Sequence, residues 1–443
     1  MWSRYLRTKE RDGIVAVFHE LHPNPAYCSQ EQWQKAKTGI TDGFETFISD
    51  LRRQKLLIDS PKDDDEEFLE TVSTLEHKLN QPTILYLMTA RGCNFNCGYC
   101  QVPEIARKYG ESKLSRTDAF AGIDLWLEHL RDAYDPNHEY FVIFYGGEPL
   151  LNKQVIWQSL EYLESKRSSG ELPARVNLMI ATNGALVDEE TVAKCKKYGV
   201  MVAVGLDGPE NVNDILKVDT EGRGTFERIV AAIKLLVVGG VRTFVSASIT
   251  PSNINEISRY AEFFKELGVE KFGFNFLKGR LLLKLVGENG LEDYYRRAAQ
   301  GVIKLARTKS GSAFEYQMEK KQNAFDRGEF FPVDCTCYGN QLVIQPDGQI
   351  SNCPFYKAEL GQVRSVGKDF RIWNQPIIQE WRKRLSLFHP GEAKAMSGGG
   401  CAWSSNELKG DPIAVDDSSR IFSEEVLNEL IWSRYDRNQF RKT

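Results

Sequence analysis

The chain contains the stretch Ile84-Leu85-Tyr86-Leu87-Met88-Thr89-Ala90-Arg91-Gly92-Cys93-Asn94-Phe95-Asn96-Cys97-Gly98-Tyr99-Cys100, in which an apolar run leads into three closely spaced cysteines. The apolar run has the length of a buried β-strand, and the polar, glycine-containing segment after it is typical of a loop. Three thiolates in a C-x3-C-x2-C pattern can hold one corner of an iron-sulfur cubane and leave its fourth iron open, whereas structural zinc normally has four ligands. The pattern therefore predicts an iron-sulfur site at a strand end; three buried cysteines or part of a zinc site are the alternatives.

The same strand begins a regular alternation of strand-like and helical segments. Such an alternation is typical of parallel βα units, whose active sites lie at the carboxyl ends of the strands. We therefore expect an α/β fold with a partial (βα)6 barrel. Periodicity alone also allows a doubly wound sheet, but no G-x-G-x-x-G opens a helix to support one. The six strand-like runs are 84–89, 140–145, 176–181, 201–206, 243–249 and 271–276.

The N-terminal region, residues 1–80, has a different pattern. An alternating run from Tyr5 to Phe18 turns at Arg11-Asp12-Gly13 and predicts a β-hairpin. Two helical stretches follow, the second over 44–57, and the acidic run 63–67 has the composition of a solvated linker. A winged-helix-like binding module fits this pattern, and a capping layer for the next domain fits it equally well.

The alternation fades after residue 310. A strand over 341–345, a turn at Pro346-Asp347-Gly348 and a second strand over 349–353 predict a hairpin. Cys337 and Cys353 would then lie near its two open ends. An amphipathic helix, roughly 423–435, closes the chain. The expected domains are 1–80, a recognition module with its linker; 81–310, the barrel; and 311–443, a cysteine-rich domain.

Composition excludes several classes of protein. The 443 residues carry 57 Lys and Arg against 61 Asp and Glu, so a formal charge of -4 attracts neither nucleic acid nor an anionic membrane. The sequence starts without an apolar signal core, and no apolar run approaches the roughly 18 residues of a membrane span, so we expect a cytoplasmic protein. Nine cysteines in such a chain favour metal or redox chemistry over a disulfide framework.

Three motifs at successive strand ends resemble those of the radical S-adenosylmethionine (radical SAM) superfamily. The resemblance implies a [4Fe-4S] cluster on Cys93, Cys97 and Cys100, whose open iron chelates S-adenosylmethionine. An electron from this cluster would cleave the cofactor to a 5′-deoxyadenosyl radical, which the protein places beside one substrate C–H bond. The motifs are the C-x3-C-x2-C, Tyr145-Gly146-Gly147-Glu148-Pro149 and Thr182-Asn183-Gly184.

The same resemblance implies roles for further residues. The two glycines of the second motif would let the backbone approach the cofactor, and the glutamate would accept a hydrogen bond from the methionine ammonium. Tyr99 would lie against the adenine. Asn183 and Ser248 are candidates for carboxylate or ribose contacts, and ordinary strand-end caps fit these two equally well. The candidate cofactor-binding residues are Tyr99, Gly146, Gly147, Glu148, Asn183 and Ser248.

Asp207 ends the fourth strand in Val204-Gly205-Leu206-Asp207-Gly208-Pro209, which resembles the barrel of peptide- and protein-modifying members. Those members often continue with His-Asp-x-x-Arg, where this chain has Asn213-Asp214-Ile215-Leu216-Lys217, so no role is carried over to those positions. Asp207 is a candidate catalytic proton acceptor. A buried aspartate that shapes the turn before Gly-Pro is the alternative.

The C-terminal cysteines resemble those of SPASM and twitch extensions, which hold auxiliary iron-sulfur clusters. Cys337, Gly348 and Cys353 fit the opening C-x(9 to 15)-G-x4-C spacing. Residues 397–401 and the end helix resemble the close of a SPASM domain, but one cysteine replaces C-x-G-G-C and polar residues 418–420 stand where a last cysteine is expected. The resemblance implies one auxiliary [4Fe-4S] cluster, with an open iron if Cys335 points away; structural zinc is the alternative. Its ligands would be Cys335, Cys337, Cys353 and Cys401.

The resemblance covers nearly the whole chain and implies a radical SAM maturase of a ribosomally synthesised precursor peptide. The N-terminal module would hold a leader segment, and hydrogen abstraction from a core residue would give a cross-link, an epimer or a rearranged backbone. A flavodoxin- or ferredoxin-type donor would supply electrons. An anaerobic sulfatase maturase and a twitch-type dehydrogenase or rearrangement enzyme for a small metabolite are the rival enzymes. Ligand-binding motifs at strand ends argue against the non-enzyme alternative, an electron carrier or zinc-stapled interaction protein.

Overall fold

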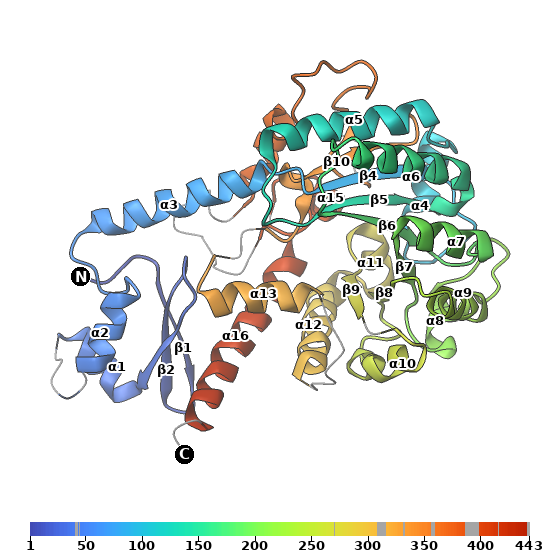
Figure 1. Ribbon diagram of the computed structural model, residues 1–443. Coiled ribbons are helices and arrows are strands. Elements are labelled where there is room, and N and C mark those ends of the chain that lie inside the picture. The colour runs from blue at the N-terminus through green and yellow to red at the C-terminus, as the bar shows by residue number, and fades with distance from the viewer. Residues whose placement is uncertain are drawn as a thin grey trace.

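The computed structural model has an eight-stranded sheet and, towards the N-terminus, a three-stranded sheet (Figure 1). The structure describes residues 1–39, 43, 45–269, 271–307, 316–330, 333–355, 359–385, 398–414 and 416–440. Six strands of the large sheet are parallel neighbours in chain order, and they are the six that the apolar runs predict. The expected partial (βα)6 barrel is therefore confirmed. These strands are β4 (Ile84–Ala90), β5 (Tyr140–Gly146), β6 (Val176–Thr182), β7 (Met201–Gly205), β8 (Thr243–Ile249) and β9 (Lys271–Phe276).

Helices connect successive strands and cover the outer face of this sheet (Figure 1). Polar residues and glycine mark their ends. The Ser115 hydroxyl accepts a hydrogen bond of 3.0 Å from the Asp118 backbone N–H, and Gly199 ends its helix in the left-handed conformation. The connecting helices are α4 (Val102–Tyr109), α5 (Arg116–Ala133), α6 (Lys153–Ser168), α7 (Glu189–Tyr198), α8 (Glu210–Leu216), α9 (Phe226–Val238) and α10 (Tyr260–Glu266).

The strands separate a packed outer layer from the interior of the barrel. In β6 the side chains of Val176, Leu178 and Ile180 are buried, whereas the residues between them are half-buried. Because a strand points successive side chains to opposite faces, one face of the sheet packs on the helices and the other lines the interior. The interior face, at the carboxyl ends of the strands, is where a ligand can be held.

The C-terminal hairpin belongs to the same sheet. β10 (Gln341–Ile344) and β11 (Ile350–Ser351) pair antiparallel, as the sequence predicts. β10 also pairs in parallel with β4, with Gln341 opposite Ile84, so the hairpin extends the barrel sheet at its first strand. The sequence did not predict this pairing, because residues so far apart in the chain leave no local pattern.

The N-terminal module is an antiparallel sheet followed by three helices. Its first two strands turn at Asp12 and Gly13, both with positive φ, which confirms the predicted hairpin. The sequence analysis missed the third strand and the third helix. Phe44, the predicted start of the second helix, lies outside the described residues. The elements are β1 (Leu6–Arg11), β2 (Ile14–His19), β3 (Ala26–Ser29), α1 (Gln30–Lys37), α2 (Glu45–Arg53) and α3 (Pro61–Leu79).

The prediction of a solvated linker over residues 63–67 is wrong, because these residues form the first turns of α3. The Ser60 side chain caps the helix, and acidic side chains in a first turn interact favourably with the helix dipole. Two of the acids are also buried. Asp64 accepts hydrogen bonds from the Ser3 hydroxyl at 2.6 Å, and Glu67 pairs with both His22 and Lys55. Composition alone does not reveal such tertiary partners.

The closing helix α16 joins the N-terminal module to the barrel (Figure 1). It is longer than predicted and packs along α12. The Tyr27 hydroxyl of β3 donates to the Ile431 carbonyl at 2.5 Å, and Arg11 of β1 forms an ion pair with Asp436. None of the helices in the described part of the chain is long and apolar enough to cross a membrane. The remaining helices are α11 (Gly279–Val286), α12 (Leu291–Arg307), α13 (Tyr316–Arg327), α14 (Pro376–Arg382), α15 (Ala402–Lys409) and α16 (Asp417–Phe440).

Candidate active site

The first three-cysteine loop follows β4 at the carboxyl edge of the sheet, and a neighbouring segment holds its backbone. The Asn96 N–H donates to the Val218 carbonyl at 2.8 Å, and the Gly98 N–H donates to the Leu216 carbonyl at 2.7 Å. Burial raises the pKa of Cys97 to about 12. A bound metal deprotonates a thiol outright, so the three half-buried cysteines of this loop suit thiolate ligands whose charge an iron cluster would compensate.

The two glycines after β5 let that strand end touch the cysteine loop. A Cβ atom on Gly146, where φ is +148°, would lie 2.2 Å from the Ala90 carbonyl oxygen. A Cβ atom on Gly147 would lie 2.2 Å from the Gly92 carbonyl oxygen. The Gly147 N–H also donates to the Ala90 carbonyl at 2.8 Å. Close approach of backbone to backbone therefore explains both glycines, while their approach to the cofactor stays a prediction.

Glu148 connects the second motif to the third. Its carboxylate is fully buried and accepts hydrogen bonds from the Thr182 hydroxyl at 2.7 Å, the Asn183 N–H at 2.8 Å and the Leu150 N–H at 2.9 Å. Burial raises the pKa of this carboxyl group. A carboxylate has about four acceptor positions, so one is left for a donor such as an ammonium.

Asn183 extends the same network to the cluster loop. Its side-chain amide donates to the Asn94 side-chain oxygen at 2.8 Å and to the Cys93 sulfur at 3.6 Å. The three motifs that the sequence separates by about ninety residues thus meet through direct hydrogen bonds. A hydrogen bond to a ligating sulfur also changes the reduction potential of an iron-sulfur cluster.

Tyr99, Asp207 and Ser248 come together on the other side of the loop. The Tyr99 hydroxyl donates to Asp207, and the Ser248 backbone N–H donates to the same carboxylate at 2.8 Å. Lys217, which the sequence analysis left without a role, places its Nζ atom 3.4 Å from Asp207. Both oxygens of the buried Asp207 therefore have donors from the protein, an arrangement that favours the turn-shaping interpretation over a proton acceptor.

Four C-terminal cysteines form a second group. Burial raises the pKa of Cys337 well above its usual value, and negative charge on the other three sulfurs acts in the same direction. A hydrogen bond from Cys337, opposed by burial, lowers the pKa of Cys335, and nearby cations contribute. Cys335 therefore lies beside Cys337 and does not point away from the group. The four are Cys335, Cys337, Cys353 and Cys401.

Two carboxylates fix the backbone of this second group. Asp334 accepts hydrogen bonds from the Gly398 and Gly400 N–H groups at 3.0 and 3.2 Å, and its partner is the buried Lys321 at 2.9 Å. Asp416 accepts a hydrogen bond from the Cys401 N–H at 2.9 Å. Ser397, the first residue of the predicted closing motif, lies outside the described residues.

The positions where a last SPASM cysteine is expected hold hydroxyl groups that bind these carboxylates. Ser418 donates to Asp416 at 2.8 Å, and Ser419 donates to Asp334. Lys278, just after β9, places its Nζ atom 3.3 Å from Asp416. Burial opposes the charge of Lys278, but Asp416 and the neighbouring anions outweigh it and raise the pKa of this lysine.

The number of cysteines bears on which metal group they suit. Three cysteines in the first loop match a cluster with one open iron, whereas four in the second group match either a fully ligated cluster or a structural zinc ion. In the described part of the chain, no three His, Cys, Asp or Glu side chains form a site for one metal ion. Cys28 and Cys195 are buried among apolar side chains, as predicted for packing residues.

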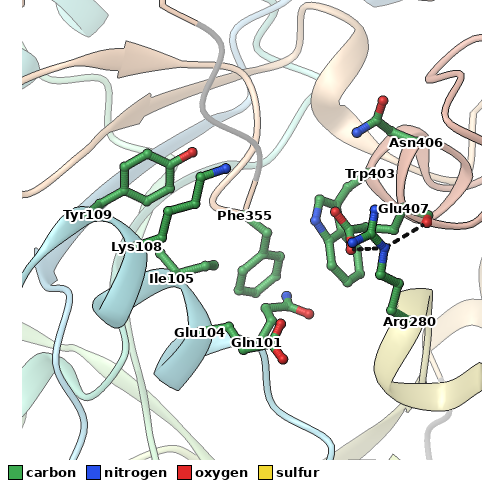
Figure 2. Close-up of a pocket in the computed structure, with 10 residues that line it drawn as sticks. All are labelled: Gln101, Glu104, Ile105, Lys108, Tyr109, Arg280, Phe355, Trp403, Asn406 and Glu407. Atoms are coloured by element: carbon green, nitrogen blue, oxygen red, sulfur yellow. Dashed lines mark hydrogen bonds and ion pairs between the residues drawn. The ribbon is translucent and has the colours of Figure 1, made fainter. Parts of the chain in front are cut away.

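A cavity of about 430 Å³ is lined by residues that follow cysteines of both groups in the chain, and Figure 2 shows the lining of this cavity. Gln101 directly follows Cys100, and Phe355 and Trp403 each come two residues after a cysteine of the second group. Figure 2 shows Phe355 between α4 on one side and Trp403 of α15 on the other.

Sequence reasoning missed the cavity and the charges around the second group. The sequence does indicate Lys217, because this residue stands at the arginine position of the His-Asp-x-x-Arg pattern. No sequence pattern indicates Lys278, Asp334 or Asp416, because their partners lie on other elements.

Comparison with known proteins identifies the domain that carries the first group. Residues 87–273 match the model of the radical SAM superfamily. The chain is 23% identical to the cysteine-type anaerobic sulfatase-maturating enzyme of Clostridium perfringens, over 64% of this chain and 78% of that protein. It is 22% identical to the antilisterial bacteriocin subtilosin biosynthesis protein AlbA of Bacillus subtilis, over 85% of each.

A solved structure resembles nearly the whole fold. SuiB of Streptococcus suis bound to precursor peptide SuiA superposes with a TM-score of 0.54 at 15% identity. The match covers 95% of this chain and 99% of that chain, so it includes most of the N-terminal module. Together with the three motifs and their hydrogen-bonded geometry, the family match shows that residues 87–273 form a radical SAM domain.

Proposed function

We propose that this protein modifies a ribosomally synthesised precursor peptide by radical chemistry. Members of its superfamily use a [4Fe-4S] cluster with S-adenosylmethionine, which together supply a 5′-deoxyadenosyl radical able to abstract hydrogen. Cys93, Cys97 and Cys100 would hold that cluster. Glu148 has an acceptor position left for the methionine ammonium, and Asn183 orients the Cys93 sulfur.

The auxiliary site would hold a second [4Fe-4S] cluster. Four cysteine ligands, Cys335 included, would complete its coordination without an open iron. The buried pair of Asp334 and Lys321 would keep the Gly398–Gly400 backbone in place around Cys401. A flavodoxin- or ferredoxin-type protein would deliver the electrons.

The N-terminal module, and its attachment to the rest of the protein, support the proposal of a peptide substrate. A three-stranded sheet has two edge strands, and an extended peptide can add to an edge through main-chain hydrogen bonds. Helix α16 runs from the auxiliary cysteine region to this sheet, where Tyr27 and Arg11 bind it. A leader segment held by residues 1–80 would therefore be tethered to the same rigid element as the auxiliary site.

Oxidation of a protein side chain, as in an anaerobic sulfatase maturase, is the second candidate. The match to the sulfatase-maturating enzyme of C. perfringens favours it. That sequence match covers 64% of this chain, whereas the sequence match to AlbA covers 85%. The longer sequence match supports a peptide maturase.

The test is an anaerobic assay of the reconstituted protein with dithionite, S-adenosylmethionine and the short peptides encoded beside its gene. We expect 5′-deoxyadenosine and a mass change in one peptide, which disappears when its leader half is removed. The Cys93/Cys97/Cys100→Ala variant should form neither product. A mass change in a sulfatase-derived peptide instead would support the second candidate, and a wild-type protein that never forms 5′-deoxyadenosine would overturn both.

A further inference from the structure

The cavity of about 430 Å³ is lined by aromatic rings from three separate segments. Phe355 follows β11, Trp403 belongs to α15 and Tyr109 ends α4. The Phe355 and Trp403 ring centres lie 6.2 Å apart with their planes tilted by 54°. Figure 2 shows these side chains, together with Ile105, around the cavity. Rings exposed to a cavity in this way are typical of recognition sites rather than of a closed core.

The aromatic lining is held in place from behind. Gly279 has a φ of +72°, and a Cβ atom there would lie 2.6 Å from the Trp403 ring, so the indole packs directly on the glycine backbone. On the opposite side, Tyr145 packs edge-on against Phe355, with ring centres 6.1 Å apart and an interplanar angle of 74°. Rings that are already fixed lose little side-chain entropy when a ligand binds.

Tyr145 also connects the cavity to both cysteine groups. Tyr145 directly precedes the two glycines that contact the first cysteine loop, and its ring packs against Phe355, which follows Cys353 by two residues. The wall formed by Tyr145, Phe355 and Trp403 thus extends from the radical SAM cysteines towards the auxiliary cysteines. A ligand side chain on this wall lies beside the place where the radical would be generated.

Most charged residues at the cavity already have partners within the protein. The Arg280 Nε atom donates to the Glu407 carbonyl at 3.1 Å and lies 3.4 Å from its carboxylate. Glu104 pairs with Lys284 at 3.6 Å. Because these opposite charges compensate each other, the cavity has no strong field of one sign, and its rings lie among polar side chains such as Gln101 and Asn406.

We propose that this cavity binds an uncharged aromatic side chain of the peptide substrate, stacked on Phe355 and Trp403. The inference rests on the proposed function, because it assigns a position to the segment that is modified. Aromatic rings pack edge-to-face or offset against one another, an interaction that an aliphatic side chain does not offer. The volume of about 430 Å³ exceeds one side chain and leaves room for the adjoining backbone.

The experiment measures the binding of two blocked pentapeptides, acetyl-Gly-Gly-Trp-Gly-Gly-amide and its leucine counterpart. The protein is the anaerobically reconstituted holoenzyme with S-adenosylmethionine, and saturation-transfer NMR titrations give each dissociation constant. We expect the tryptophan peptide to bind about fivefold to tenfold more tightly than the leucine peptide. Phe355→Leu and Trp403→Leu should each abolish that preference.

Two further variants keep the test decisive. Tyr109→Leu lies at the exposed end of α4, away from the second cysteine group, and it should reduce the preference about threefold. Phe120→Leu removes a ring that stacks on Tyr162 at 4.2 Å outside the cavity, so it should leave the preference unchanged. Iron content reports whether each variant is folded.

Equal affinity of the wild type for the two peptides would overturn the proposal, and so would an unchanged preference in both Tyr109→Leu and Phe355→Leu. This binding assay does not depend on cofactor cleavage. A protein that cleaves S-adenosylmethionine and modifies its peptide but shows no aromatic preference would refute the cavity assignment alone. A protein that prefers the tryptophan peptide but never forms 5′-deoxyadenosine would refute the proposed function alone.

Discussion

The two cysteine groups are built in opposite ways. Cys93, Cys97 and Cys100 share one short loop after β4, which backbone hydrogen bonds and close glycine contacts hold against the neighbouring strands. The second group gathers residues from 335 to 401, and buried carboxylates and lysines hold its backbone. The first group is a local motif held mainly by backbone contacts, whereas the second depends on tertiary contacts between charged side chains.

Because the two groups are held in different ways, they should be sensitive to different kinds of mutation. A loop held by backbone contacts is sensitive to added volume, because the carbonyl groups around it cannot rotate away. A group held by buried ion pairs is sensitive to loss of charge, because removing one member leaves the other in a poorly solvating environment. Four experiments compare these sensitivities directly.

The thiols of the metal-free protein should differ most in alkylation by iodoacetamide. A hydrogen bond from Cys337 lowers the pKa of Cys335 below its usual value, whereas burial raises the pKa of Cys93 to about 12. Only the thiolate reacts, so at pH 7 Cys335 should be modified at least about a hundredfold faster. Between pH 7 and 9 the alkylation rate of Cys93 should rise about tenfold per pH unit, while that of Cys335 should rise less steeply.

Peptide mapping by mass spectrometry measures both rates in one sample. In Cys337→Ala, Cys335 should no longer be alkylated faster than Cys93, because the hydrogen bond that stabilises its thiolate is gone. Equal rates for Cys335 and Cys93 in the wild type would show that the two groups do not differ in their electrostatics.

Gly147→Ala should disable the first group and spare the second. Its new methyl group would lie 2.2 Å from the Gly92 carbonyl oxygen, so the cysteine loop must move. We expect about half of the iron to be lost and 5′-deoxyadenosine formation to fall at least about a hundredfold, since a small displacement at a reacting centre costs about that much. Gly92→Ala is the matched control in the same loop, because its methyl group would meet only the Glu111 side chain at 3.4 Å. A Gly147→Ala variant with full iron content would contradict this account.

Asp334→Asn should disable the second cysteine group and spare the first. The change removes the negative charge that compensates the buried Lys321 and that holds the Gly398 N–H. We expect a loss of about 3 kcal/mol in the free energy of unfolding and loss of the auxiliary iron only. Asp293→Asn, in an exposed pair with Arg297, should cost less than about 0.5 kcal/mol. Denaturant unfolding of the metal-free protein measures both, and similar losses in the two variants would argue against a buried charge network.

The smallest expected effect is on the reduction potentials of the two clusters. Lys278→Met removes a cation beside the auxiliary cysteines and should lower the auxiliary potential by on the order of 50–100 mV. Asn183→Ala removes one hydrogen bond to the Cys93 sulfur and should lower the other potential by about 60 mV or less. Redox titrations followed by electron paramagnetic resonance separate the two signals. If Lys278→Met moved the potential of the first cluster instead, the assignment of this lysine to the auxiliary site would be wrong.

The same contrast explains how much could be predicted from the sequence. All six barrel strands, the C-terminal hairpin and the three-cysteine loop are visible as local patterns, and the structure has them where the sequence predicts. The pairing of β10 with β4 and the partners of Lys278 depend on residues far apart in the chain, so no local pattern indicates them. The acidic start of α3 was misjudged for the same reason, because its partners Ser3 and His22 lie on other elements.

Iron, zinc and sulfide analysis with electron paramagnetic resonance tests the central claim most directly. The samples are the anaerobically reconstituted wild type, Cys93/Cys97/Cys100→Ala and Cys335/Cys337/Cys353/Cys401→Ala. Two cubanes predict about eight irons in the wild type and about four in each variant, with only the second variant keeping a signal that S-adenosylmethionine perturbs. A wild type with about four irons and one zinc, whose iron vanishes in the first variant, would contradict the auxiliary cluster.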